Sequence, residues 1–189
     1  MKIYLFRHGK TLSNEKKTYT GSIDVDLSSK GISEITKYIS KKVYPDNCQL
    51  FTSPMLRAIK TLEMIYEDDY IVCNDLRETH FGDWEGKSYQ NLKNDPSYLS
   101  WINDPLLNYP PNGESFNDFK ERVINEYKNI LLLNNQDKVI MSHGGTIRAI
   151  MSEMVDPSKS FFDYSINNGL GYVLEYESNK LVAYKEINE

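Results

Sequence analysis

The sequence is poor in cysteine. Cys48 and Cys73 are the only two, they do not form a Cys-x-x-Cys pair, and they lie far in sequence from the histidines, so they do not suggest a zinc site. We expect both to be buried free thiols in a reducing cytoplasm, with a disulfide between them as the alternative.

Long apolar runs are also missing. The first apolar run, Ile3 to Phe6, ends at Arg7 and is too short for a signal peptide or a membrane span. No repeat or low-complexity tract occurs. We therefore expect a cytoplasmic protein with no membrane partner.

A basic excess is absent as well. The chain carries 27 acidic and 22 basic residues, a net charge of -5. A nucleic-acid-binding protein usually shows a basic excess, so no nucleic-acid partner is expected. A phosphate site remains compatible with this balance, because a few local arginines can outweigh a weak global charge.

What is present fits one domain covering residues 1–189. Hydrophobic residues make up 40% of the chain and aromatic residues 12%, which is enough for one core. Short apolar runs alternate with helical patterns, and this alternation indicates an α/β domain. Strands are predicted at 3–6, 49–52, 70–73, 138–141, 170–176 and 181–187.

The helices are predicted from apolar spacing and from capping residues. Ser28 is expected to cap the first, and Ser53 the second, with Pro54 at its first position. The apolar positions expected on the four helices are, in chain order, Ile32, Ile35 and Ile39; Met55, Ile59 and Leu62; Phe116, Phe119, Val123, Tyr127 and Ile130; and Ile147, Ile150, Met151 and Met154. Between them, the segment 81–114 is rich in glycine and proline, which predicts loops and short helices forming one wall of a binding site.

Three polar clusters each follow directly after a predicted strand. They are Arg7-His8-Gly9, Ser53 to Arg57, and Ser142 to Arg148. In open α/β sheets, ligands bind in the crevice beyond the carboxyl ends of the strands. The clusters therefore predict one site with two histidines, at least two arginines and the N–H donors of two helix N-termini.

This inventory suits a phosphoryl group. Arginine offers a planar fork of donors that stays charged, and its hydrogen bonds to phosphate are charge-assisted. A neutral imidazole can attack phosphorus and form a covalent intermediate. A leaving alkoxide also needs a proton, which a carboxylic acid could supply. Glu78, Asp83 and Glu85 are all candidates for that acid, and the residues alone do not choose among them.

Five blocks, in this order along the chain, resemble the signature of the histidine phosphatase superfamily, also called the phosphoglycerate-mutase-like family. The blocks are Arg7 to Thr11 with Asn14, Ser53 to Thr61, Leu76 to Gly86, Asn112 to Ser115, and Ser142 to Gly145. The resemblance implies a three-layer α/β/α sandwich with a mostly parallel sheet, and chemistry that needs no metal or other cofactor.

The resemblance also implies roles for individual residues. His8 would be the nucleophile, Glu78 the proton donor, and Arg7, Arg57 and His143 the groups that hold the phosphoryl group. Asn14, Thr20, Gly21 and Gly144 would contact the substrate. Two positions depart from the family: Lys10 stands where Glu or Gln is usual, and Thr20 where Gln is common before glycine.

The short step from Gly86 to Glu114 favours a phosphatase over a phosphoglycerate mutase. The stretches Trp101 to Pro105 and Pro111 to Val123 resemble the α-ribazole phosphatase branch, which acts in cobalamin nucleotide-loop assembly. The expected partner is a small phosphate ester. A broad sugar-phosphate phosphatase, a mutase and a non-catalytic phospholigand-binding module are the alternatives, and no oligomeric state follows from the residues.

Overall fold

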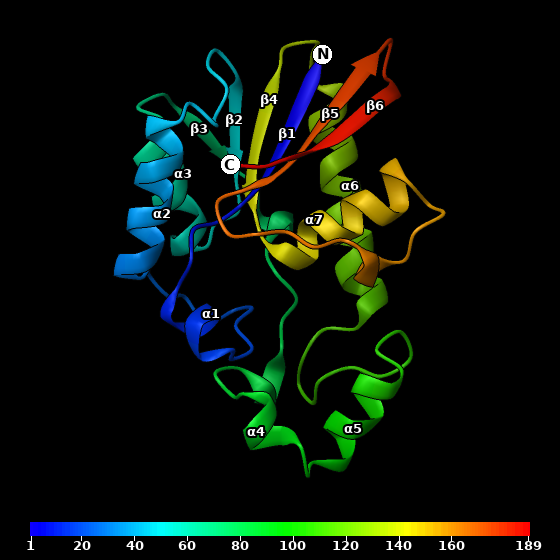
Figure 1. Cartoon of the computed structure of the whole chain (residues 1–189). Coiled ribbons are helices and arrows are strands. Elements are labelled where there is room, and N and C mark those ends of the chain that lie inside the picture. Colours follow the sequence, from blue (N-terminus) through cyan, green and yellow to red (C-terminus); the bar gives the residue numbers. More distant parts are fainter.

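The computed structural model describes residues 1–189 and is built on a six-stranded sheet with the order β3-β2-β4-β1-β5-β6 (Figure 1). Strands β1 to β4 are parallel, and β5 runs antiparallel to both β1 and β6. The strands are β1 Lys2–Arg7, β2 Gln49–Thr52, β3 Tyr70–Val72, β4 Lys138–Ser142, β5 Gly171–Glu177 and β6 Lys180–Ile187. The mostly parallel sheet and all six predicted strands are confirmed.

Helices cover both faces of this sheet. Helices α6 and α7 pack on one face, against the core side chains that include Leu5 and Ile140. Helices α2 and α3 pack on the other face, against Phe6 and Met141. The helices are α1 Leu12–Lys16, α2 Ser29–Ser40, α3 Leu56–Ile65, α4 Tyr89–Leu92, α5 Pro96–Asn103, α6 Phe116–Leu132 and α7 Gly144–Ile150. Successive side chains of β1 and β4 point to opposite faces of the sheet. Because helices cover both faces, both strands are apolar on both sides, as is typical of buried parallel strands.

Two helix details differ from the prediction. Ser28 caps α2 as expected, but Ile32 and Ile39 are exposed, and Gly31 and Tyr38 join Ile35 on the buried face. Helix α3 begins at Leu56, with Met55 rather than Ser53 as its N-cap. Ser53 is instead buried beside His143, because its hydroxyl forms a hydrogen bond with that imidazole.

The cysteines are both free, so the disulfide alternative is wrong. Cys73 is buried as expected, whereas Cys48 is only half-buried. Burial raises the pKa of the Cys73 thiol to about 12, with a smaller contribution from a hydrogen bond to Glu126, which keeps this thiol protonated. No helix of the structure is long and apolar enough to cross a membrane.

The segment 81–114 leaves the sheet and returns to it, as predicted. It carries the 3-10 turn η2 (Gly82–Trp84) and helices α4 and α5, which lie beyond the carboxyl ends of the parallel strands (Figure 1). Trp84, Leu92 and Tyr98 form a small core of their own there. This small core, separate from the two clusters on the faces of the sheet, places aromatic side chains over the end of the sheet where the polar clusters lie.

The buried central strand β4 sets the main stability prediction. Ile140 is fully buried in the larger core cluster, so Ile140→Ala leaves a cavity and should lower the free energy of unfolding by about 2–5 kcal/mol. Val182→Ala on the exposed edge strand β6 is the control and should stay within about 0.5 kcal/mol of the wild type. Urea unfolding measures both, and equal losses would contradict the placement of Ile140.

Candidate active site

The three predicted clusters meet at one edge of the sheet. Strand β4 pairs with β1 on one side and β2 on the other, all in parallel, so their carboxyl ends are neighbours. The imidazole rings of His8 and His143 lie 5.2 Å apart between centroids. His8, His143 and Arg57 are all buried. The structure therefore brings together the groups expected to hold a phosphoryl group.

The tautomer of His8 is set by its own loop. Its Nδ1 lies 2.7 Å from the carbonyl oxygen of Gly9, which can only accept, so Nδ1 carries the proton and donates it. A neutral ring then has its lone pair on Nε2. Burial is the main cause that lowers the pKa of His8 well below its usual range, with Arg57 and Arg7 adding to it. His8 is therefore a neutral imidazole whose lone pair lies on Nε2.

His143 is arranged for a different task. Its Nε2 lies 2.7 Å from Ser53 Oγ, and its Nδ1 is buried with no partner in the protein. Ser53 Oγ accepts the Met55 N–H, which leaves the hydroxyl proton free to donate to His143 Nε2. Burial, then the charge of Arg57, lowers the pKa of His143 well below its usual range. The ring is then neutral. In the tautomer whose Nε2 accepts the Ser53 hydroxyl proton, its one N–H donor is on Nδ1 and has no partner in the protein.

The two arginines are held by backbone carbonyls. Arg57 donates to the carbonyls of Gly21 at 2.8 Å and Ile23 at 3.1 Å, and Arg7 donates to that of Ile166 at 2.7 Å. The Nε of Arg7 is buried without a partner. Burial lowers the pKa of both guanidiniums, but an arginine starts so far above neutral pH that both stay charged. The site therefore combines two fixed positive charges with two neutral imidazoles.

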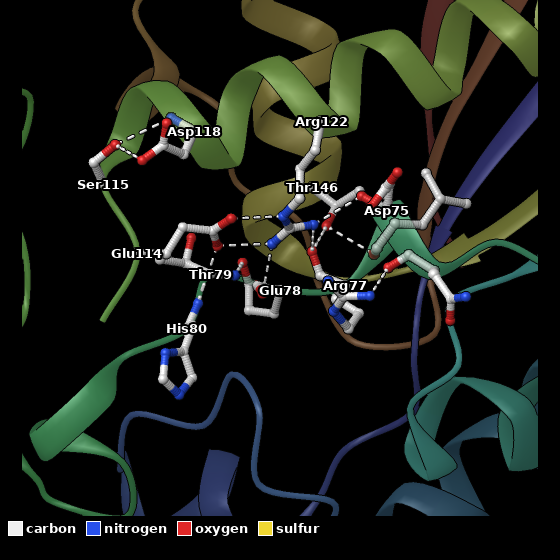
Figure 2. A network of polar contacts seen from close by, with 12 residues as sticks. Asp75, Arg77, Glu78, Thr79, His80, Glu114, Ser115, Asp118, Arg122 and Thr146 are labelled. Atoms are coloured by element: carbon white, nitrogen blue, oxygen red, sulfur yellow. Dashed lines mark hydrogen bonds and ion pairs between the residues drawn. The ribbon is translucent and has the colours of Figure 1, made fainter. Parts of the chain in front are cut away.

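Glu78 is the one of the three acid candidates that the structure places in the site. Its two carboxyl oxygens accept the N–H groups of Thr79 and Gly145, each at 2.9 Å. A Cβ at Gly145 would lie 2.1 Å from Glu78 Oε1, so only glycine allows this approach. Figure 2 shows Glu78 on the chain segment that precedes His80.

The other two carboxylates have structural partners. Asp83 is exposed and accepts from the amide of Asn112. Glu85 accepts backbone N–H groups from two loops: that of Gly21 in one and that of Phe81 in the other. Burial alone would raise the pKa of Glu85, but the hydrogen bonds from Ser22, Phe81 and Gly21 together lower it. Glu85 is an anion that holds the Gly21 loop in place.

The helix N-termini contribute less than expected. The Leu56 N–H donates to Asp24 at 2.7 Å, and the Gly145 N–H is taken by Glu78. The Gly9 N–H is also taken, by Thr61 Oγ1 at 2.8 Å. These N–H groups are used by side chains of the protein itself and are not free to bind a ligand. Gly144, at the first position of α7, packs beside the Arg7 guanidinium.

The predicted substrate contacts lie around the same edge. The side-chain oxygen of Asn14 accepts from Thr11 in a capping box, and its amide nitrogen has no hydrogen-bond partner in the chain. The Thr20 side chain bonds only the Thr18 carbonyl, at 3.4 Å, and that of Lys10 pairs with Glu34 at 2.8 Å. Lys10 therefore has a local partner.

Two features of the site had only weak signals in the sequence. Asn168 donates to the His8 carbonyl at 3.0 Å, and an Asn-Asn-Gly turn before β5 was the sole hint of a special role. A cavity of about 200 Å³ opens beside Glu78 and Gly145. Half of its lining residues are aromatic: Tyr19, Phe81, Trp101, Phe116, Phe161 and Phe162. They come from five separate segments of the chain, which no spacing rule brings together.

The sequence matches a known protein family. The family model described as histidine phosphatase superfamily (branch 1) matches residues 3–188, so the chain belongs to that superfamily. The family and its phosphatase-named relatives make the chain a hydrolase of the phosphatase class.

Individual relatives give the same picture. A Hydrogenobacter thermophilus protein, provisionally named as a phosphoserine phosphatase, is 30% identical over 159 residues, covering 79% of this chain and 76% of that protein. The adenosylcobalamin/α-ribazole phosphatase of Salmonella typhimurium is 26% identical over 89% of this chain and 87% of its own. The crystal structure of the α-ribazole phosphatase from Shigella flexneri superposes with a TM-score of 0.84 at 25% identity, covering 100% of this chain and 96% of that chain.

The buried imidazoles predict how stability depends on pH. Both are neutral in the folded protein, whereas the unfolded chain binds protons at histidine below about pH 6.5. The unfolded state then holds more protons, so stability falls as the pH drops through this range, by up to ~1.4 kcal/mol per pH unit for each histidine. Urea unfolding between pH 7.5 and 5.5 measures the slope. His8→Gln should lower it by about half; an unchanged slope would argue against a neutral, buried His8.

Proposed function

We propose that the chain is a metal-independent phosphomonoesterase that forms a phosphohistidine at His8 and acts on α-ribazole 5′-phosphate in cobalamin nucleotide-loop assembly. The observation that carries the substrate assignment is the aromatic cavity beside Glu78. The chemistry is supported by the neutral His8 between two arginines.

In the first step, His8 Nε2 attacks phosphorus while the bond to the ester oxygen breaks. Arg7 and Arg57 stabilise the negative charge of the transferred group, and the Nδ1–H of His143 donates to one of its oxygens. Glu78, as the carboxylic acid, gives its proton to the leaving alkoxide. The products are phosphohistidine, the free alcohol and the Glu78 carboxylate.

In the second step, the Glu78 carboxylate takes a proton from water as that water attacks phosphorus. The bond between phosphorus and His8 Nε2 breaks and the neutral imidazole is restored. Its Nδ1–H remains hydrogen-bonded to the Gly9 carbonyl throughout. Inorganic phosphate leaves. One residue therefore acts first as acid and then as base, because both proton transfers occur on the same side of the phosphoryl group.

The cavity decides which leaving group fits. It starts at Glu78, where the ester oxygen departs, and its aromatic lining suits a flat apolar ring. α-Ribazole carries such a ring, a benzimidazole on its ribose. Phosphoserine and phosphoglycerate leave small polar alcohols that bury little aromatic surface. The named α-ribazole phosphatases among the relatives support the same substrate.

A broad sugar-phosphate phosphatase is the second candidate. Polar groups also line the cavity, among them Thr79 and Arg148, and sugar hydroxyls could use them. Arg148 donates its Nε to the Tyr164 carbonyl at 2.8 Å, and its guanidinium lies 6.0 Å from the centroid of the Phe161 ring.

The intermediate gives a direct test. Quenching with alkaline detergent during turnover of labelled p-nitrophenyl phosphate should trap a phosphoenzyme on His8 that is stable in base and loses its label in acid. His8→Ala should trap none and lose at least roughly 10³-fold in kcat, because no other group in the site replaces the nucleophile. His80→Ala changes an exposed histidine and should behave as wild type. Label in the His8→Ala protein would contradict the role of His8.

The substrate is tested by phosphate release in the presence of EDTA. The panel holds α-ribazole 5′-phosphate, ribose 5-phosphate, phosphoserine, 3-phosphoglycerate and p-nitrophenyl phosphate. The kcat/KM for α-ribazole 5′-phosphate should exceed that for ribose 5-phosphate by roughly tenfold or more, since only the former fills the aromatic cavity. Similar values across the panel would support the broad phosphatase, and a preference for phosphoserine or 3-phosphoglycerate would contradict the proposal.

A further inference from the structure

Arg122, on the inner side of α6, has a partner for every donor of its guanidinium (Figure 2). Its Nε and one NH2 hydrogen go to the two carboxylate oxygens of Glu114, at 2.6 and 2.8 Å. The other three hydrogens go to the backbone carbonyls of Asp75 at 2.8 Å, Arg77 at 2.9 Å and Glu78 at 3.0 Å. One side chain therefore binds five acceptors: two belong to the segment carrying the proposed acid, and a third to the turn just before it.

That segment has little else to hold it. Residues 77–81 lie between the 3-10 turns η1 (Asn74–Leu76) and η2, outside any strand or helix. Backbone carbonyls that are shielded from water need a hydrogen-bond partner. Besides Arg122, the Thr146 hydroxyl bonds the carbonyls of Leu76 and Arg77, both at 3.2 Å. Donors from two helices replace the sheet ladder that would otherwise fix this stretch.

Glu114 binds the same segment on the other side of Glu78. The backbone N–H of Glu114 donates to the His80 carbonyl at 2.9 Å, and its carboxylate accepts the His80 N–H at 3.3 Å. Only 15% of the Arg122 side chain and 16% of the Glu114 side chain are exposed. The ion pair is thus shielded from water, and it joins the start of α6 to both sides of Glu78.

We propose that Arg122, with Glu114, is a positioning residue that acts through Glu78: it fixes the backbone from which the acid reaches the ester oxygen. The inference rests on the role of Glu78 proposed above. A general acid must lie within hydrogen-bond reach of the atom it protonates, and a displacement of about 1 Å can cost ~10²-fold in rate. Arg122 itself contacts no substrate, since its donors are all used within the protein.

The test compares an ester with a good leaving group, p-nitrophenyl phosphate, and one with a poor leaving group, phenyl phosphate. Arg122→Lys keeps a positive charge for Glu114 but has only three donors on one nitrogen, so it cannot hold the three carbonyls as well. It should lower kcat/KM for phenyl phosphate by roughly tenfold or more, and for p-nitrophenyl phosphate by about twofold at most, since only the poor leaving group needs the acid.

A double variant separates positioning from general damage. Glu78→Gln alone should show the same selectivity for leaving groups, and adding Arg122→Lys to it should change neither rate further, because the acid is already gone. Equal loss with both esters, or a full additional loss in the double variant, would overturn the inference. If Glu78→Gln itself shows no selectivity, the proposed acid fails instead.

Two further variants serve as controls. Lys120, on the same helix as Arg122, pairs with Glu153 of the helical turn after α7; Lys120→Met removes this ion pair and should leave both rates unchanged. Glu114→Gln keeps the side-chain shape but removes the charge that orients Arg122. It should shift selectivity in the same direction as Arg122→Lys, and it replaces that variant if Arg122→Lys does not fold. A Glu114→Gln protein with wild-type selectivity would contradict the proposed role of Arg122 and Glu114 in positioning Glu78.

Discussion

The site depends on burying two guanidiniums and two imidazoles next to one another. Four positive charges in one buried place would repel strongly, since the interior screens them less than water does. The arginines keep their charge, so the imidazoles give up theirs: burial and the arginines lower the pKa of both His8 and His143. The neutrality that relieves this repulsion also gives His8 a free lone pair, so electrostatic necessity and nucleophilic reactivity have one cause.

Backbone carbonyls hold the arginines in this arrangement. Arg57 is bound by the loop at Gly21, and that loop is bound in turn by the Glu85 carboxylate. A Cβ at Gly21 would lie 1.7 Å from the Thr79 carbonyl oxygen, so this loop also packs directly on the backbone next to Glu78. Arg57, proposed to bind the phosphoryl group, and the proposed acid are therefore positioned by neighbouring stretches of chain in close contact.

The sheet, its parallel centre and the convergence of three clusters could be predicted from the sequence. Buried strands such as 138–142 are apolar on both faces, and polar residues directly after them must meet at one edge. The choice of Glu78 over Asp83 and Glu85 could not be made from residue types. It depends on the Gly145 N–H and on Arg122, which lie 67 and 44 residues further along the chain.

The aromatic cavity and the start of α3 were beyond prediction for related reasons. The cavity is assembled from loops whose relative placement follows from tertiary packing, not from spacing. Ser53 and Pro54 have the residue types of a helix start, yet the Ser53 hydroxyl forms its bond with His143 and the helix begins at Leu56. Here a tertiary hydrogen bond outweighed a local capping preference.

The small core around Trp84, Leu92 and Tyr98 separates two tasks in the molecule. The groups proposed to hold phosphorus lie at strand ends beside the main core. Phe81, Trp101 and Pro105, in the cavity wall proposed to contact the alcohol, belong to the excursion, which packs on its own apolar centre. Substitutions at Trp101 or Pro105, unlike those at Glu85 and Glu114, can therefore reshape the proposed alcohol pocket while the contacts that hold Arg57 and Glu78 stay in place. The alcohol that fits can then change while the groups at the strand ends stay the same.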